Sequence, residues 1–267
     1  MLRLAHEEDK IPLLKILRTD PARAMFIIGD IEQNGLHTEY QTTWIEEVDG
    51  VILAVYLKYH MNFVFYIISE HFDRENILLL LAATQCENVN AVKSHFVKVE
   101  DQIGSFVKTR EMFFCACTAL VDRPGILTVR KARPEDASRI ARSLVTIVEF
   151  NLETVTIEER EERIRSRLSE GKSRAYLLEI GQEVVAYAST AVETKSSAMV
   201  ASVFCLPAFR GRGYAKQVVW ALSDDLLNSG LIPCLFYDNP NAGRIYHALG
   251  YQTFDTWVLG KNERSQP

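Results

Sequence analysis

The loop at residues 210–215 has residue types that could bind an anion. It consists of Arg210, Gly211, Arg212, Gly213, Tyr214 and Ala215. Glycines let backbone N–H groups approach a ligand closely, and the arginines add positive charge. The loop lacks the Lys-Ser/Thr pair of a P-loop nucleotidase and the G-x-G-x-x-G pattern of a dinucleotide site. The composition predicts a pyrophosphate cradle, with a tight turn carrying solvated arginines as the alternative.

Two elements must position this loop. An apolar run at residues 200–206 predicts a strand that Pro207 ends. A helix is expected to follow the loop and to stop at Gly230, and its N-terminal N–H groups would face the anion. Its apolar face recurs at spacings of three and four, at Ala215, Val218, Val219, Leu222 and Leu226.

A second segment, residues 238–251, follows a predicted strand at 232–237. Pro240 is expected to begin a short helix that Gly250 ends. The two segments together resemble the GCN5-related N-acetyltransferase (GNAT) family, and within it the branch similar to FR47. The first carries the family's Arg/Gln-x-x-Gly-x-Gly/Ala pattern at Arg210, Gly213 and Ala215, and the second its Asn-x-x-Ala-x-x-x-Tyr-x-x-x-Gly-Phe/Tyr pattern at Asn239, Ala242, Tyr246, Gly250 and Tyr251.

The resemblance implies a role for each site residue. Residues 210–215 would bind the pyrophosphate of acetyl-CoA, and Tyr246 would protonate the departing thiolate as general acid. A bulge commonly splays the preceding strand in the family, and its backbone near Phe204 and Cys205 would polarise the acyl carbonyl. Asn239 and Asn241 would bind the pantetheine arm, although turn formation explains asparagines there equally well.

The general base is the part of the site that the sequence does not supply. Many relatives carry a glutamate on the strand before the loop, but residues 198–206 contain no carboxylate. Deprotonation of the amine through ordered water is the expected substitute. The alternative bases are Glu193, Glu149 and Glu153. Each of them could instead be an ordinary solvated surface charge.

The five cysteines form no C-x-x-C pair and have no histidine cluster nearby, so neither a metal site nor a disulfide is expected. Cys115 and Cys117 would lie on one face of a strand as small apolar residues. Cys205 is either a covalent nucleophile or a space-filling strand residue. The second interpretation is favoured, because no neighbouring histidine or lysine would lower the pKa of its thiol.

Composition limits the possible partners. The net charge is −5 and no basic stripe occurs, which argues against nucleic acid and mildly favours an amine substrate. The apolar stretches are too short to span a membrane, and residues 1–20 carry charges throughout without the apolar core of a signal peptide. We therefore expect a cytoplasmic monomer or homodimer without a membrane segment.

The 267 residues predict two domains. In the second half we expect a strand at 126–131, helices at 134–150 and 156–171, and strands at 175–180 and 183–193. The strand, loop and helix described above follow, and a last strand lies at 256–259. This succession is what the resemblance implies for a catalytic GNAT domain at residues 126–267.

The first half is predicted to be a degenerate copy of the same fold, at residues 1–123. The pattern indicates a helix from Asp20 to Ile28, a hairpin of 44–48 and 51–59, and a strand at 62–68. Helices at 77–83 and 89–95 and a strand at 111–120 complete it. Because no glycine loop of the family pattern precedes residue 126, this half is not expected to bind acetyl-CoA. The fold class is thus α/β with a mixed sheet, in a tandem GNAT arrangement.

The sequence does not identify the molecule that accepts the acyl group. The loop Glu149–Glu153 is expected to border the acceptor site, which suits a small amine or a peptide N-terminus. Three functions stay open: an amine N-acetyltransferase that uses acetyl-CoA, an acyl-CoA-binding regulatory protein without turnover, and an acyltransferase that uses a longer acyl-CoA. The first is favoured.

Overall fold

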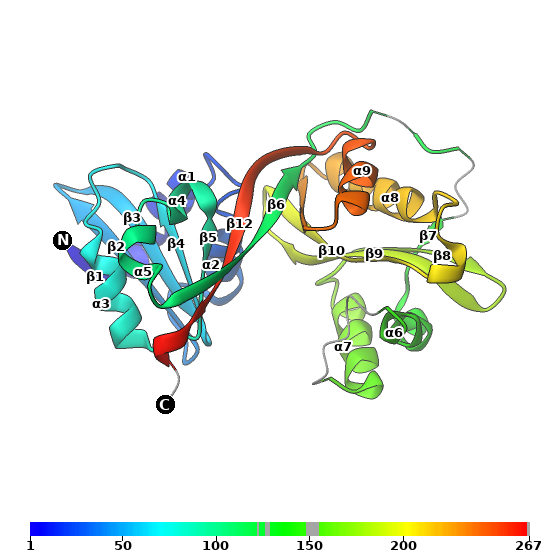
Figure 1. Cartoon of the computed structure of the whole chain (residues 1–267), viewed down its shortest axis with the longest axis horizontal. Coiled ribbons are helices and arrows are strands. Elements are labelled where there is room, and N and C mark those ends of the chain that lie inside the picture. The colour runs from blue at the N-terminus through cyan, green and yellow to red at the C-terminus, as the bar shows by residue number, and fades with distance from the viewer. Residues whose placement is uncertain (122, 126–128, 148–154, 266–267) are drawn as a thin grey trace. The chain divides into compact units, whose positions relative to one another are not determined.

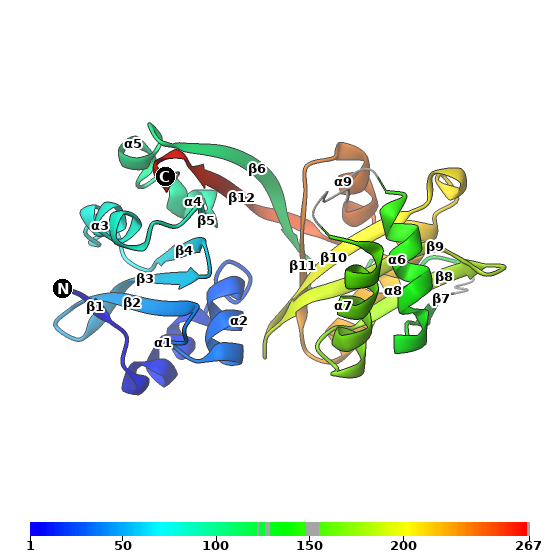
Figure 2. The ribbon, with the colours of Figure 1, turned by 90° about the horizontal axis from the view of Figure 1, so that it is seen from below.

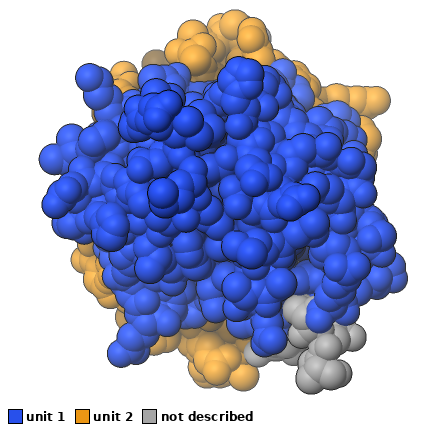
Figure 3. All heavy atoms as spheres, turned by 90° about the vertical axis from the view of Figure 1, so that its left-hand side faces the viewer, with its two compact units in different colours: residues 1–114, 253–267 blue, residues 115–252 orange. Residues whose placement is uncertain are grey.

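The computed structural model describes residues 1–121, 123–125, 129–147 and 155–265. The chain forms two compact units, which are blue and orange in Figure 3. Unit 1 consists of Met1–Phe114 and Thr253–Pro267, and unit 2 consists of Cys115–Gln252. The predicted strand at 126–131 and the candidate loop Glu149–Glu153 fall partly or wholly outside the described residues.

Unit 1 is a mixed sheet with helices beside it (Figures 1 and 2). Its strands are β1 (Leu2–Leu4), β2 (Gln41–Val48), β3 (Val51–Tyr59), β4 (Asn62–Ile67), β5 (Asn88–Val92) and most of β6 (Val107–Ala116) and β12 (Gln252–Asn262). The helices are α1 (Lys10–Leu17), α2 (Met25–Asn34), α3 (Glu75–Thr84), α4 (Lys93–Phe96) and α5 (Glu100–Ile103). Strands β1 to β4 pair antiparallel, and β4 pairs parallel with β5.

Unit 2 repeats this plan. Its strands are β7 (Val129–Lys131), β8 (Ala175–Ile180), β9 (Glu183–Glu193), β10 (Ser197–Cys205) and β11 (Ile232–Tyr237), and its helices are α6 (Ala137–Val145), α7 (Ile157–Ser169), α8 (Tyr214–Asn228) and α9 (Pro240–His247). Strands β7 to β10 pair antiparallel, and β10 pairs parallel with β11. Helices α6 and α7 lie on one face of this sheet and α8 and α9 on the other (Figures 1 and 2).

An ion-pair network occurs once in each unit and marks the duplication. In unit 1, Arg3 bridges Asp9 at 2.7 Å and Glu47 at 3.0 Å. In unit 2, Arg130 bridges Asp136 at 2.7 Å and Glu179 at 3.0 Å. In both units the aspartate also accepts the backbone N–H three residues before it. The Arg–Asp spacing and the ion-pair distances are the same in both units, which agrees with the predicted duplication of one fold.

The boundary between the units lies at different residues from those predicted. The final strand was expected in the second domain, but β12 pairs with β5 of unit 1, where Trp257 lies opposite Val92. Val258 of β12 is buried in the apolar core of unit 1. Conversely β6 begins in unit 1 and ends in unit 2, where the Cys117 N–H donates to the Pro233 carbonyl at 3.0 Å. Strand β12, the last of the chain, thus belongs almost wholly to unit 1, and β6 enters unit 2 only at Cys115 and Ala116.

Two predicted helices of the first half were wrong in part. Residues 89–95 form strand β5 followed by the short helix α4, because Val89, Ala91 and Val92 are buried between two paired strands. The helix expected at Asp20–Ile28 begins only at Met25 and continues to Asn34. The hairpin about Asp49 and Gly50 is confirmed, and both residues have the positive φ that such a turn requires.

The predicted elements around the glycine loop are confirmed. Strand β10, helix α8, strand β11 and helix α9 follow one another in the expected order. The capping box at the start of α7 is also present, because the Glu159 N–H donates to Thr156 Oγ1 at 3.2 Å and the Thr156 N–H donates to Glu159 Oε2 at 3.0 Å. Helix α6 is shorter than expected and ends at Val145.

Candidate active site

The loop at residues 210–215 has the backbone geometry of an anion cradle. Gly211 and Gly213 have φ of +79° and +76°, which glycine adopts without strain. Gly213 is the N-cap of α8. Within the described part of the chain, none of the backbone N–H groups from Gly211 to Lys216 donates to another residue. A Cβ added at either glycine would meet no atom within 4 Å, so open space lies beside these donors.

The side chains of the loop frame this space. Arg210 Nε donates to the Cys205 carbonyl at 3.1 Å, which ties the loop to the end of β10. The Arg212 guanidinium lies 5.6 Å from the centre of the Phe209 ring, a cation–π distance. Tyr214 and Ala215 form the first turn of α8. The site therefore combines unused N–H donors, a helix N-terminus and two cations, which fits a pyrophosphate.

Strand β10 leaves its parallel partner before it reaches the loop. Its pairing with β11 covers only Ser197–Met199. On the other side, the register with β9 shifts between Ala201 and Phe204, and Ser202 has φ of +52°. This is the bulge that the family resemblance implied, and it lies just before Phe204 and Cys205. A bulge turns backbone groups out of the ladder, so backbone groups of this part of β10 are available for other interactions.

Tyr246 lies on α9 with its ring in the core of unit 2. The side chain is 7% exposed, and its ring centre lies 5.8 Å from Tyr237 and 6.0 Å from Tyr251. Burial, with a smaller contribution from Cys115, raises the pKa of Tyr246 to about 12. The hydroxyl makes no hydrogen bond with the described residues. Tyr246 is therefore protonated at neutral pH.

A tyrosine–histidine pair next to Tyr246 was missed by the sequence analysis. His247 Nδ1 lies 2.9 Å from the Tyr251 carbonyl and so carries the proton of the neutral ring. Its Nε2 then accepts from the Tyr237 hydroxyl at 2.9 Å. A Cβ at Gly243 would lie 2.5 Å from the Tyr237 ring, which explains glycine at this position of α9. These contacts fix α9, and with it Tyr246, against β11.

The two asparagines have a structural role in this conformation. Asn239 is the N-cap of α9, and its Oδ1 accepts the Asn241 N–H at 2.9 Å. Both side chains are exposed at the start of the helix. Turn formation, the alternative interpretation, is thus what these contacts support, and pantetheine binding by the two residues stays a prediction.

Cys205 does not have the environment of a reactive thiol. Burial raises the pKa of Cys205, although Arg210 and Arg212 act in the opposite direction. A raised pKa leaves the thiol protonated at neutral pH, and a protonated thiol is a weak nucleophile. The five cysteines are all free, and no group of metal-binding side chains gathers among the described residues. Cys205 therefore fits the space-filling interpretation.

None of the three candidate bases is placed beside the bulge by the described contacts. Glu193 accepts from Thr190 Oγ1 at 2.7 Å and pairs with Arg174 at 3.2 Å, so both of its oxygens are engaged. Glu149 and Glu153 lie outside the described residues.

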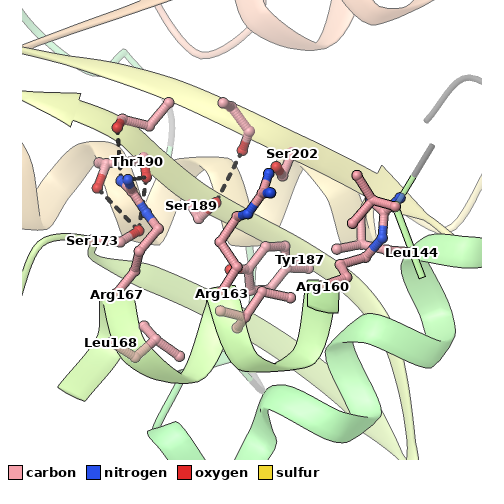
Figure 4. Close-up of a pocket in the computed structure, with 14 residues that line it drawn as sticks. Leu144, Arg160, Arg163, Arg167, Leu168, Ser173, Tyr187, Ser189, Thr190 and Ser202 are labelled. Carbon is pink, nitrogen blue, oxygen red and sulfur yellow. Dashed lines mark hydrogen bonds between the residues drawn. The ribbon is translucent and has the colours of Figure 1, made fainter. Parts of the chain in front are cut away.

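A cavity of about 290 Å³ lies on the other face of the sheet from α8 (Figure 4). Helix α7, strand β9 and the bulged part of β10 surround it. Its lining includes Arg160, Arg163 and Arg167 from α7, Ser189 and Thr190 from β9, and Ala201 and Ser202 from β10. The sequence analysis did not identify these residues. The spacing of the arginines along one helix face was the only signal of them in the sequence.

The corresponding helix of unit 1 has no free cradle. The N–H groups at the start of α3 are occupied, because Asp73 Oδ1 accepts the Glu75 N–H at 3.0 Å and Glu46 Oε1 accepts the Asp73 N–H at 2.6 Å. Glu46 is 3% exposed and also accepts from the Tyr56 hydroxyl at 2.8 Å. Acidic side chains thus lie at the start of α3, and they would repel phosphate.

Comparisons with known proteins agree with this geometry. A model of the acetyltransferase (GNAT) family matches residues 142–251, which lie within unit 2. No curated protein matches the chain. This segment is therefore similar to the acetyltransferase (GNAT) family, whose members transfer an acyl group from an acyl-CoA to an acceptor.

Solved structures match the whole length of the chain. A GCN5-related N-acetyltransferase from Sphaerobacter thermophilus is 14% identical, with a TM-score of 0.67 over 100% of this chain and 96% of that one. A GNAT-family acetyltransferase from Colwellia psychrerythraea is 10% identical, with a TM-score of 0.64 over 98% and 99%. A tandem GNAT protein from the clavulanic acid biosynthesis pathway is 12% identical, with a TM-score of 0.59 over 100% and 99%. These likenesses establish the tandem GNAT fold, with a degenerate first copy.

Proposed function

We propose that the protein is an N-acetyltransferase that moves the acetyl group of acetyl-CoA to a primary amine, with a single active site in unit 2. The observation that carries this proposal is the run of unused backbone N–H groups from Gly211 to Lys216 at the start of α8. Such a terminus stabilises a bound phosphate by direct hydrogen bonds and by the helix dipole, which alone contributes roughly 0.3–2 kcal/mol.

The residues present fit each demand of the reaction. The amine nitrogen attacks the acyl carbonyl, the new C–N bond forms, and the C–S bond breaks. One proton of the ammonium leaves to water before the attack, because both oxygens of Glu193 are engaged elsewhere, and the nitrogen loses a second proton to water as the amide forms. Tyr246, whose pKa burial raises to about 12, gives its proton to the thiolate and regains one from water. N–H groups of the bulged strand near Phe204 and Cys205 stabilise the carbonyl oxygen.

The engagement of Glu193 also favours a second candidate, a protein that binds acyl-CoA without turnover. Thiol release by the full-length protein, measured with acetyl-CoA and octanoyl-CoA against a panel of amines, separates the alternatives. Release with acetyl-CoA is expected. Release only with octanoyl-CoA would assign a longer acyl donor, and calorimetric binding of CoA without any release would favour the regulatory protein. Absence of both binding and release would contradict acyl-CoA recognition altogether.

Every helix among the described residues is too short or too polar to cross a bilayer. Cytoplasmic location and the monomeric or homodimeric state stay predictions.

A further inference from the structure

The cavity beside the bulge is strongly cationic. It is lined by Arg160, Arg163 and Arg167, and no aspartate or glutamate is among its lining residues. Figure 4 shows the three arginines extending from α7 toward the strands. The remaining polar lining consists of hydroxyl groups, on Ser173, Tyr187, Ser189, Thr190 and Ser202. The whole chain has a net charge of −5, so this concentration of positive charge is local.

Two of the three arginines have no partner within the described residues. Arg167 is held by backbone, since its Nη2 donates to the carbonyls of Thr190 at 3.3 Å and Ala191 at 2.7 Å. Arg160 Nε is buried and has no hydrogen-bond acceptor in the described part of the chain. Arg163 likewise makes no ion pair or hydrogen bond there. Arg160 as a whole is half-buried and Arg163 is exposed, so the unsatisfied buried atom is Arg160 Nε. A ligand that supplies an acceptor there gains a charge-assisted hydrogen bond.

Three of the four glutamates on the same helix have other partners, and the fourth, Glu158, is exposed in its first turn. Glu161 and Glu162 both pair with Arg165, which does not line the cavity. Glu159 accepts the Thr156 N–H in the capping box. Arg160 and Arg163 thus form no ion pair with the described carboxylates of α7, and an anionic ligand could pair with them.

The position of the cavity relates it to the proposed reaction. Ala201 and Ser202, which are among its lining residues, belong to the bulge where β10 separates from β11. The anion cradle lies at the start of α8, on the opposite face of the same sheet (Figures 1 and 2). A donor bound at the cradle and an acceptor bound in the cavity would thus meet at the bulge from opposite faces.

We propose that this cavity binds the acceptor, and that the acceptor is a small amine that also carries an anionic group, held by Arg160 and Arg163. The proposal rests on the proposed function and specifies its substrate class. A carboxylate matches the two-pronged guanidinium fork, and a phosphate offers the same chemistry. The volume of about 290 Å³ suits a single amino acid or a molecule of that size.

The test compares matched amines in the thiol-release assay with the full-length protein and acetyl-CoA. Each common L-amino acid is measured beside its primary amide, and phosphoethanolamine beside ethanolamine. At least one anionic amine should be used with a kcat/KM about tenfold or more above that of its neutral partner. A preference for amino acids would mean that the cavity binds a carboxylate, and a preference for phosphoethanolamine would mean that it binds a phosphate.

Variants locate the preference in the cavity. R160Q/R163Q should raise the KM for the anionic amine about tenfold or more, with kcat changed far less and CoA affinity unchanged. R165Q is the matched control, because it removes an arginine of the same helix that lies outside the cavity, and it should alter neither constant. A melting curve of each variant checks that it is folded.

Three results would overturn the inference. In the first, the neutral partners have the same kcat/KM as the anionic amines. In the second, R160Q/R163Q has the KM of the wild type. In the third, only neutral amines release thiol. The first and third of these leave the proposed acyl transfer intact. If no amine releases thiol, saturation-transfer NMR with N-acetylated amino acids and with phosphoethanolamine decides the binding claim. Signals in the wild type that R160Q/R163Q loses support it, and the absence of signals in the wild type contradicts it.

Discussion

At the residue scale, Tyr246 and Gly213 carry the chemistry that we propose. The Tyr246 side chain is 7% exposed, and this burial keeps its phenol protonated well above neutral pH. Gly213 supplies a positive φ at the start of α8, where side chains would both strain the backbone and enter the space beside the free N–H groups. The two residues affect different steps, so a Tyr246 variant should change kcat and a Gly213 variant should change CoA affinity.

Tyr246→Phe should lower kcat about tenfold or more while CoA affinity hardly changes. The substitution deletes only the hydroxyl, and a positioned proton donor contributes to the transition state rather than to ground-state binding. Steady-state kinetics with the accepted amine and calorimetric titration with CoA measure the two effects. Full turnover in the variant would show that another group or water protonates the thiolate.

Gly213→Val should abolish CoA binding, with Gly230→Val as the matched control. Gly230, at the other end of α8, has the same φ of +76° and the same open surroundings. Both variants should lose stability by about 1–2 kcal/mol, because a side chain disfavours this left-handed conformation. Only Gly213→Val blocks access to the backbone N–H groups at the start of α8. Equal CoA affinity in the two folded variants would exclude the loop as the cradle.

At the element scale, the duplicated Arg–Asp–Glu network fastens the first strand of each unit to the turn before its first helix. Asp136 is 3% exposed, and hydrogen bonds from Arg130, Arg133 and Arg139 hold its pKa well below the usual range, with that of Arg130 the largest cause. A carboxylate whose pKa is lowered on folding stabilises the protein above its unfolded pKa. That stabilisation is lost as the pH falls through the lowered folded pKa.

Asp136→Asn should therefore lower the free energy of unfolding by about 1–3 kcal/mol at pH 7, because charged donors lose their acceptor. The difference from the wild type should shrink as the pH falls below about 4, where the unfolded aspartate is already protonated. Urea unfolding at a series of pH values measures this. A difference that stays constant down to pH 2 would mean that the charge of Asp136 does not stabilise the fold.

The elements differ in how well their sequence specifies them. Helix α8 and strand β10 were predictable because their apolar spacing and flanking Pro207 and Gly230 are local signals. Strand β5 was mistaken for a helix because its pairing with β12 joins residues far apart in the chain. The bulge at Ser202 was expected only through the family resemblance. The cationic cavity could not be predicted, since it depends on how α7 packs on β9 and β10.

At the scale of the whole molecule, the last strand of the chain, β12, belongs to unit 1 rather than to unit 2. Trp257 of β12 is 4% exposed, and its ring centre lies 4.8 Å from Phe26 and 6.2 Å from Phe114, both in unit 1. The C-terminal strand is thus part of the core of unit 1. The sequence pattern of β12 does not indicate which unit the strand joins, because the same pattern would suit a strand of either unit.

Trp257→Ala should destabilise unit 1 by about 3–5 kcal/mol, the usual cost of removing a buried aromatic side chain. Leu259→Ala on the same strand, where the side chain is 37% exposed, should cost far less. Hydrogen exchange read by mass spectrometry can follow the two units separately, and CoA affinity reports on unit 2. Loss of protection in residues 129–252 rather than 1–114 would contradict the assignment of β12.

A crystal structure of the full-length protein with acetyl-CoA tests the central claim most directly. The account predicts one cofactor molecule per chain, with its pyrophosphate against the N–H groups from Gly211 to Lys216 and its thioester between the ends of β10 and β11, near Tyr246. The start of α3 in unit 1 should stay empty, because Asp73 and Glu46 occupy its N–H groups. Cofactor bound in unit 1, or bound in unit 2 away from the glycine loop, would contradict the account.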